Sequence, residues 1–173
     1  MNLSLVDPEL AVALAQFAQM DIWSDLPLSR KLIAQARLGL MTALPAIENV
    51  TSTDYSVPRT DVLGPSAAPE VSVRVYRPED QTQHLPALLW IHGGGYCLGS
   101  MEQDDYLVRQ MVKEVGCAVV SVDYRLAPEH PFPAPLDDCY SALCWLFSNT
   151  EQLNVDGSRI GIGGISAGAG FAA

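Results

Sequence analysis

Positive charge is scarce in this sequence of 173 residues. It contains 10 Lys and Arg against 20 Asp and Glu, which gives a formal net charge of −10. A nucleic-acid-binding surface needs a basic face to meet phosphates, and a segment that binds anionic lipids needs the same. The composition therefore argues against a nucleic-acid partner and against an anionic membrane surface.

Long apolar runs are missing as well. The apolar stretches are short or broken by Gly and Pro, whereas a membrane-spanning helix needs about 20 consecutive apolar residues. The sequence starts MNLSLVDPEL, with no Lys or Arg before an apolar run, which is unlike a secretory signal. We therefore expect no membrane span, no signal peptide and a cytoplasmic location.

Cysteine pairs with the spacing of a metal site are also absent. Cys97, Cys117, Cys139 and Cys144 are irregularly spaced, with no CxxC motif. A disulfide framework would be unusual in a chain of this length without a secretory signal. We expect free, mostly buried thiols in a reducing compartment, and neither a metal nor a cofactor.

What the sequence does contain is enough apolar material for a core. Apolar residues make up 49% and charged residues 17%, the balance of a globular chain. Residues 1–48 are predicted to form two amphipathic helices, starting at Asp7-Pro8-Glu9 and near Ser24-Asp25. We expect 1–48 to be a helical cap segment, which either packs on the main domain or forms a lid over a pocket.

Strands and helices alternate from residue 49 onward. Residues near 50–57 and 71–76 read as strands, and Val71, Val73 and Val75 would share one buried face. Two near-continuous apolar runs, 85–91 and 117–122, fit strands of a covered parallel sheet. Helices are expected over about 103–115 and from 135, the latter with Leu136, Tyr140, Leu143 and Phe147 on one side, and a last strand over 159–163. This order predicts an α/β fold.

A G-x-S-x-G motif, Gly164 to Gly168, follows that last strand directly. Such a motif forms a sharp strand-to-helix turn, in which the Ser is strained and exposed and side chains two residues either side would clash. It predicts Ser166 as a nucleophile, supported by Gly164 and Gly168. Phosphate-binding loops fit poorly: the third glycine of G-x-G-x-x-G would fall on Ser166, and Ala169 stands where a P-loop needs Lys.

A second glycine motif, His92-Gly93-Gly94-Gly95, follows the buried strand 85–91. Successive glycines let backbone N–H groups approach a bound ester, and this is the HGGG form of the oxyanion hole. The N–H of Ala167, after the nucleophile, would be a further donor. Each donor aimed at the oxyanion is worth about 3–4 kcal/mol. An isolated Gly-rich loop would mean little, but the two motifs occur in the order of an α/β-hydrolase.

Three segments together resemble the hormone-sensitive-lipase family of α/β-hydrolases, in particular its bacterial esterases. They are HGGGYCLGS at 92–100, DYRLAPEHPFPAPLDDCY at 123–140 and GISAG at 164–168. The resemblance implies an α/β-hydrolase fold with a mostly parallel sheet, the cap at 1–48 and the start of the catalytic domain at 49–173. It places the oxyanion glycines on Gly93–Gly95 and the nucleophile on Ser166, and gives His92, Asp123, Tyr124 and Glu129 supporting roles.

The chain departs from this family in three ways. Ile165 stands where the family usually has a polar residue, and Ala169 where it often has a second glycine. The triad order in this fold is Ser, then Asp or Glu, then His. Only seven residues follow Ser166, none of them acidic or His, and His84, His92 and His130 all precede it. We expect none of the three to be the base.

The resemblance also implies the strand order 1-2-4-3-5-6-7-8, with 159–163 as strand 5. Each missing strand–helix unit takes roughly 30 residues, so about 100 residues of the fold would be absent. We expect a sheet that stops after strand 5 and a 173-residue chain that is inactive alone.

The motifs and the resemblance together predict a carboxylic-ester hydrolase that works through an acyl-enzyme on Ser166. The resemblance to the bacterial esterases alone implies small-molecule esters with short acyl chains as substrates. The alternative is a non-catalytic remnant or a binding module that uses the old pocket. The remaining triad members could come from a missing C-terminal piece of a truncated or cleaved enzyme, and a homo-oligomer is possible.

Overall fold

The computed structural model describes residues 6–16, 21–59 and 70–173. The chain divides into two compact units, Met1–Ile33 and Ala34–Ala173. The boundary at residue 48 between a cap and a catalytic part stays a prediction. None of the helices in the described ranges has both the length and the apolar character of a membrane span.

The two N-terminal helices begin where the sequence predicts. Helix α1 covers Pro8–Gln16, and the N–H of Glu9 donates to Asp7 Oδ1 at 2.9 Å. Helix α2 covers Leu26–Thr42, and the N–H of Leu28 donates to Asp25 Oδ1 at 3.0 Å. Both aspartates thus accept from N–H groups that have no partner within the first helical turn. The role of these helices as a lid stays a prediction.

The described residues form a five-stranded sheet in the order β1-β2-β4-β3-β5. The strands are β1 (Val50–Val57), β2 (Val71–Pro78), β3 (Leu85–Ile91), β4 (Ala118–Asp123) and β5 (Val155–Gly164). β4, β3 and β5 run parallel, whereas β2 is antiparallel to both β1 and β4. The sheet is therefore mixed, and the site lies in its parallel part. The α/β-hydrolase fold and the predicted order of the first five strands are confirmed.

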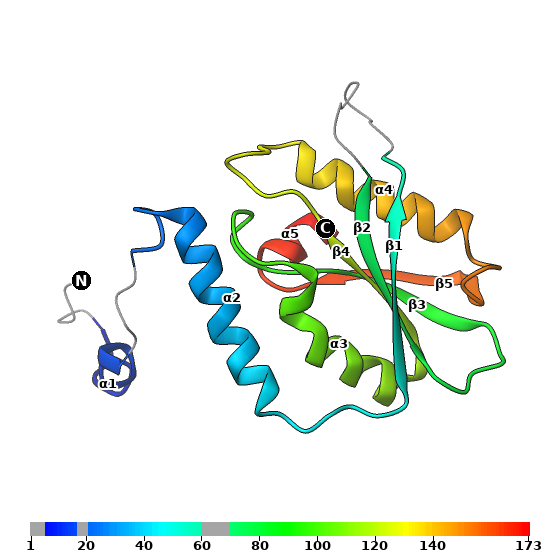
Figure 1. Cartoon of the computed structure of the whole chain (residues 1–173), viewed down its shortest axis with the longest axis horizontal. Coiled ribbons are helices and arrows are strands. Elements are labelled where there is room, and N and C mark those ends of the chain that lie inside the picture. Colours follow the sequence, from blue (N-terminus) through cyan, green and yellow to red (C-terminus); the bar gives the residue numbers. More distant parts are fainter. Residues whose placement is uncertain (1–5, 17–20, 60–69) are drawn as a thin grey trace. The chain divides into compact units, whose positions relative to one another are not determined.

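Helices cover both faces of this sheet (Figure 1). Helix α3 (Asp105–Met111) follows a 3-10 turn and continues into a π turn, where the sequence predicted a single helix over 103–115. Its residue Val108 and the adjoining Val112 pack with Trp90 on one face. Helix α4 (Ala134–Ser148) packs on the other, with Cys139, Ala142 and Leu146 in the main core. The short helix α5 (Ala167–Ala172) adds its last residues to that same face.

Burial departs from the simple sequence pattern at two places. Val71, Val73 and Val75 are buried as predicted, but Tyr76, on the opposite side of β2, is also 0% exposed because α3 covers that side. The hydroxyl of Tyr76 donates to Asp105 at 2.9 Å. On α4, the apolar side predicted from the spacing is partly open to solvent: three of its four residues, Leu136, Tyr140 and Phe147, are exposed.

Candidate active site

The two glycine motifs meet at the carboxyl ends of neighbouring parallel strands. Ile91 of β3 pairs with Gly164 of β5, so the two strands end at the same level. β3 then continues into His92–Gly95, and β5 into Ser166 and α5. A Cβ built on Gly93 would lie 3.3 Å from the Cβ of Ser166. Segments some 70 residues apart in the sequence therefore form one site.

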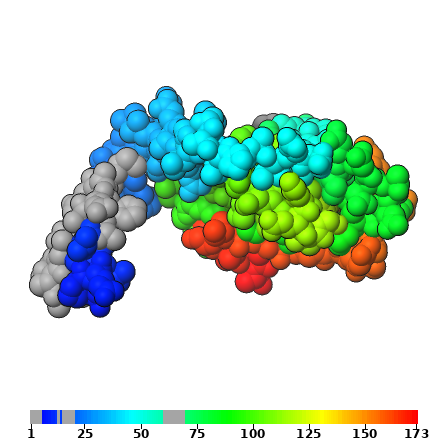
Figure 2. Space-filling model, turned by 90° about the horizontal axis from the view of Figure 1, so that it is seen from below, coloured from blue at the N-terminus to red at the C-terminus, as the bar shows by residue number. Residues whose placement is uncertain are grey.

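Ser166 occupies a strained turn between β5 and α5. Its φ of 54° and ψ of −118° belong to a region that non-glycine residues rarely adopt. A Cβ at Gly168 would lie 2.0 Å from the carbonyl oxygen of Ile91, and one at Gly164 would lie 2.6 Å from the same oxygen. Backbone cannot yield to such contacts, so the turn requires glycine at both positions. Ser166 itself is exposed, and its segment, red in Figure 2, reaches the surface.

The loop after β3 is a tight turn in which the N–H groups of two glycines are unengaged by the described residues. Gly94, Gly95 and Tyr96 all have positive φ, at 136°, 60° and 65°. The N–H groups of Cys97 and Leu98 donate to the carbonyl of Gly94 at 3.2 and 2.9 Å, which closes the turn. No hydrogen bond among the described residues uses the N–H of Gly94 or Gly95. Both N–H groups belong to the loop that begins beside Ser166 at Gly93.

Ala167 supplies a further amide on the α5 side. It is the first residue of α5, and an N–H at that position has no acceptor within its own helix. Its side chain is buried, which fixes the backbone. Ile165, before the nucleophile, donates its N–H to the Ile91 carbonyl at 3.3 Å, and its side chain is exposed. The unusual residue at 165 thus leaves the backbone of the turn intact.

His92 supports the loop and is not placed to act as a base. Its ring is 0% exposed, and its Nδ1 lies 2.8 Å from the carbonyl oxygen of Gly93. A carbonyl only accepts, so Nδ1 carries the proton. The Nε2 atom is buried and has no hydrogen-bond partner in the described part of the chain. Burial lowers the pKa of His92 below its ordinary value, which keeps the ring neutral.

Tyr124 and Asp123, at the end of β4, brace the segments that flank the site. The Tyr124 hydroxyl donates to the His92 carbonyl at 2.8 Å, and its ring stacks on the His92 ring with centroids 4.1 Å apart. Asp123 accepts the N–H of Met101 at 3.3 Å, in the turn that leads to α3. The supporting roles that the resemblance implies for both residues stay predictions. Glu129 is exposed in the next segment, and its support role stays a prediction.

The other two histidines are also unsuited to activate Ser166. His84 Nδ1 lies 3.4 Å from the carbonyl of Val155, at the end of β5 opposite to Ser166. His130 is exposed in the segment between β4 and α4. Ser166 has no hydrogen bond to a histidine among the residues that the structure describes. Within the described residues, the predicted nucleophile therefore lies beside the predicted oxyanion loop with no histidine in hydrogen-bond contact.

Asp138 is the centre of a buried ion cluster that the sequence did not predict. Its carboxylate is 0% exposed and binds Arg125 through Nε and Nη2, each at 2.9 Å. It also accepts the backbone N–H of Arg125 at 2.9 Å and Nε of Arg59 at 2.7 Å. The cluster ties the segment that leaves β4 to helix α4. The available signal was an acid at 138 between the core positions Pro135 and Cys139 of α4.

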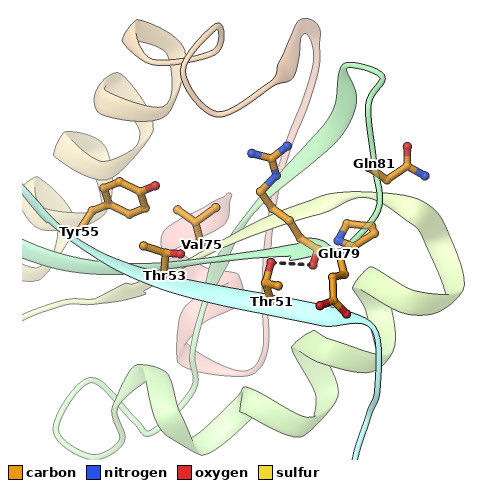
Figure 3. A pocket seen from close by; sticks show the side chains of 8 residues that line it. Thr51, Thr53, Tyr55, Val75, Glu79 and Gln81 are labelled. Carbon is orange, nitrogen blue, oxygen red and sulfur yellow. Dashed lines mark hydrogen bonds between the residues drawn. The ribbon is translucent and has the colours of Figure 1, made fainter.

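A hollow of about 290 Å³ lies elsewhere, along β1 and β2 (Figure 3). Thr51, Thr53, Tyr55 and Glu79 are among the residues that line it. None of its lining residues belongs to the predicted site. No group of three or more His, Cys, Asp or Glu within the described ranges is arranged to hold a metal ion.

The buried His92 leads to a testable pH dependence. Because its folded pKa is depressed, the unfolded chain binds more protons than the folded one below about pH 6.5, and this residue's contribution to stability falls as the pH drops. In ¹H–¹³C spectra, the His92 imidazole of the folded protein is expected to titrate at a lower pH than in the urea-denatured protein. A folded His92 that titrates above the denatured value would contradict the buried, neutral ring.

A family model and the similar proteins of known function indicate the same family for this chain. Residues 88–173 match a family described as having the alpha/beta hydrolase fold. The carboxylesterase NlhH of Mycobacterium tuberculosis is 42% identical over 111 residues, which cover 64% of this chain and 35% of that protein. The arylesterase of Saccharolobus solfataricus is 39% identical over 104 residues, covering 60% and 34%. The sequence motifs and these matches thus indicate the same family.

Solved structures agree with this result. A bacterial heroin esterase superposes with a TM-score of 0.83 at 42% identity and covers 96% of this chain and 50% of its own. A hyperthermophilic esterase from the archaeon Pyrobaculum calidifontis gives 0.80 at 36% identity, with 95% and 50% covered. The chain therefore spans about half the length of these structures, and about a third of the curated relatives named above.

Proposed function

Because this chain belongs to the α/β-hydrolase fold family through its residues 88–173, we propose that it carries the nucleophile and oxyanion hole of a carboxylic-ester hydrolase. One observation supports the proposal above all others. Ser166, exposed and strained at φ 54°, lies beside a loop in which the N–H groups of Gly94 and Gly95 are unengaged. Amide donors next to a serine at a strand-to-helix turn are the arrangement that acyl transfer needs.

The proposed reaction has two stages. Ser166 Oγ attacks the ester carbonyl carbon, its proton passes to a base, and the carbonyl electron pair moves onto the oxygen. The N–H groups of Gly94, Gly95 and Ala167 stabilise this oxyanion, with Gly93 leaving room for the ester beside Ser166. The oxyanion collapses, the protonated alcohol leaves, and an acyl-enzyme remains. Water then attacks the acyl carbon in the same way and releases the acid and Ser166.

The base of this reaction would come from outside the 173 residues. His92 is engaged by Gly93, and His84 lies at the far end of β5. Loss of the histidine of a serine triad lowers the rate by on the order of 10⁶. We therefore propose that the 173 residues alone hydrolyse esters poorly, and that a further polypeptide segment or a partner chain completes the triad.

The substrate class follows from the relatives. Those named above are a carboxylesterase, an arylesterase, a heroin esterase and a hyperthermophilic esterase, so each is named for ester hydrolysis. We propose a small carboxylic ester with a short acyl chain, hydrolysed in the cytoplasm without a cofactor.

A second candidate function is binding without turnover. The absence of a histidine next to Ser166 among the described residues favours it, because an unactivated serine hydroxyl is a weak nucleophile. Such a module would hold an ester on the amides of the HGGG loop and release it unchanged.

A fluorophosphonate probe separates the two functions. In the full-length protein, an activated Ser166 is expected to form a covalent adduct that peptide mass spectrometry assigns to Ser166, whereas the isolated residues 1–173 label at least about 100-fold more slowly. Ser148, an exposed serine on α4, serves as the internal control and stays unlabelled. A full-length protein that binds an ester analogue but never labels at Ser166 would favour the binding module.

A further inference from the structure

Three aromatic rings connect the two halves of the site. The ring of Phe171 meets Tyr96 edge to face with centroids 4.8 Å apart, and meets Tyr124 in the same way at 5.3 Å. Tyr96 belongs to the turn of the HGGG loop, Tyr124 follows β4, and Phe171 belongs to α5, which begins after Ser166. Edge-to-face pairs of this kind are favoured arrangements of aromatic rings. The loop and the nucleophile helix therefore touch through side chains as well as through backbone.

The backbone of Tyr96 has an uncommon conformation and is held by a hydrogen bond. Its φ of 65° is uncommon for a residue with a bulky side chain. Its carbonyl accepts the N–H of Ala127 at 3.0 Å, from the segment that follows β4. Strained residues of this kind persist where the surrounding structure over-determines them, and they are frequent at functional sites. The reaction mechanism proposed above does not use the Tyr96 side chain.

The far end of the Tyr96 ring fits against a glycine of α5. A Cβ built on Gly170 would lie 2.6 Å from the Tyr96 hydroxyl oxygen, and its next nearest atom would be Tyr96 Cζ at 3.7 Å. The hydroxyl thus occupies the space that a side chain at 170 would take. At this point the end of the Tyr96 side chain, which is 43% exposed overall, lies against the bare backbone of α5.

We propose that Tyr96 is a positioning residue, which sets the spacing between the oxyanion donors and Ser166 by its contacts with Phe171 and Gly170. This inference rests on the proposed ester hydrolysis. Tyr96 directly follows Gly95, whose N–H is one of the unengaged donors, and Gly170 is four residues beyond Ser166 in the same short helix. A shift at the Tyr96–Gly170 contact therefore changes the distance between the oxyanion donors and Ser166, on which transition-state stabilisation depends. Displacements of about 1 Å in such sites can cost about 100-fold in rate.

A pair of substitutions tests the spacing directly. In the full-length protein, Gly170→Ala is expected to lower kcat for p-nitrophenyl acetate about 10-fold or more, with KM changed less than about 3-fold, because the new methyl group pushes the Tyr96 hydroxyl away. Adding Tyr96→Phe removes that hydroxyl and is expected to restore most of the lost kcat. A loss of helix stability would not explain a lower kcat in Gly170→Ala, because alanine stabilises a helix relative to glycine.

Two further variants complete the experiment. Tyr96→Leu removes the ring and is expected to lower kcat about 10-fold or more, while Tyr96→Phe alone retains most of it. Gly161→Ala is the matched control, because its Cβ would find Leu88 at an ordinary 3.7 Å, and its kcat stays at the wild-type level. The inference about Tyr96 is overturned if the double variant does not regain kcat. It is also overturned if Tyr96→Leu changes the melting temperature but not kcat; neither result contradicts the proposed function. An inactive wild-type protein overturns the proposed function and the inference together.

Discussion

Replacement of Ser166 by alanine is expected to lower kcat for p-nitrophenyl acetate by on the order of 10⁶-fold, about 8 kcal/mol in activation free energy. The expectation applies to the full-length protein with its base in place. Alanine keeps the Cβ, so the strain at φ 54° and the contacts of the turn are unchanged. The loss therefore reports the missing hydroxyl and not a collapsed turn.

The control for this variant is Ser148→Ala on α4. Ser148 is exposed, and its hydroxyl donates only to the carbonyl of Cys144 at 2.9 Å, so kcat should not change. Melting curves of both variants should overlay that of the wild type. If Ser166→Ala retained wild-type activity, another residue would be the nucleophile, and the assignment of the site would be wrong.

Replacement of Asp138 by alanine is expected to lower the free energy of unfolding by about 3–5 kcal/mol. The carboxylate is fully buried and forms ion pairs with two guanidinium groups, those of Arg125 and Arg59. The variant leaves these cations partly buried without their anion, which is far more costly than losing a surface ion pair. Urea titration monitored by circular dichroism measures the change.

The neighbouring Asp137 gives a matched control for that experiment. It directly precedes Asp138 in α4 and carries the same charge, but it lies in the first turn of the helix and is not fully buried. Asp137→Ala should cost only about 0.3–1 kcal/mol, the loss of an acid near a helix N-terminus. Equal destabilisation by the two substitutions would show that the buried ion cluster adds nothing beyond the helix-end charge.

The sequence predicted those parts of the site that depend on local backbone geometry. Gly164 and Gly168 were expected around a strained serine, and the structure shows the backbone oxygen of Ile91 that excludes a side chain at both. The starts of α1 and α2 were predicted for the same reason, since Asp7 and Asp25 act within three residues of themselves. Such features need no knowledge of the tertiary fold.

Contacts between segments that are distant in the sequence could not be predicted from it. Arg59 and Asp138 are 79 residues apart in the sequence, and neither position predicts the other. Tyr76 alternates with buried valines and should face water, yet α3 covers it, because the helix between β3 and β4 crosses that face of the sheet. The contact between Tyr96 and Gly170 is of the same kind. Periodicity reports which side of an element is apolar, but not what lies opposite.

The pairing of Ile91 with Gly164 also bears on how this site forms during folding. These residues are 73 positions apart (164 − 91), and a parallel strand pair of such sequence separation closes late, after the local helices and the β1–β2 hairpin. The HGGG loop and Ser166 follow opposite members of that pair. The N–H of Ile165 donates to the Ile91 carbonyl across the pair, so the turn at Ser166 is complete only once β3 and β5 have paired, and ester hydrolysis is expected to recover during refolding no earlier than this pairing.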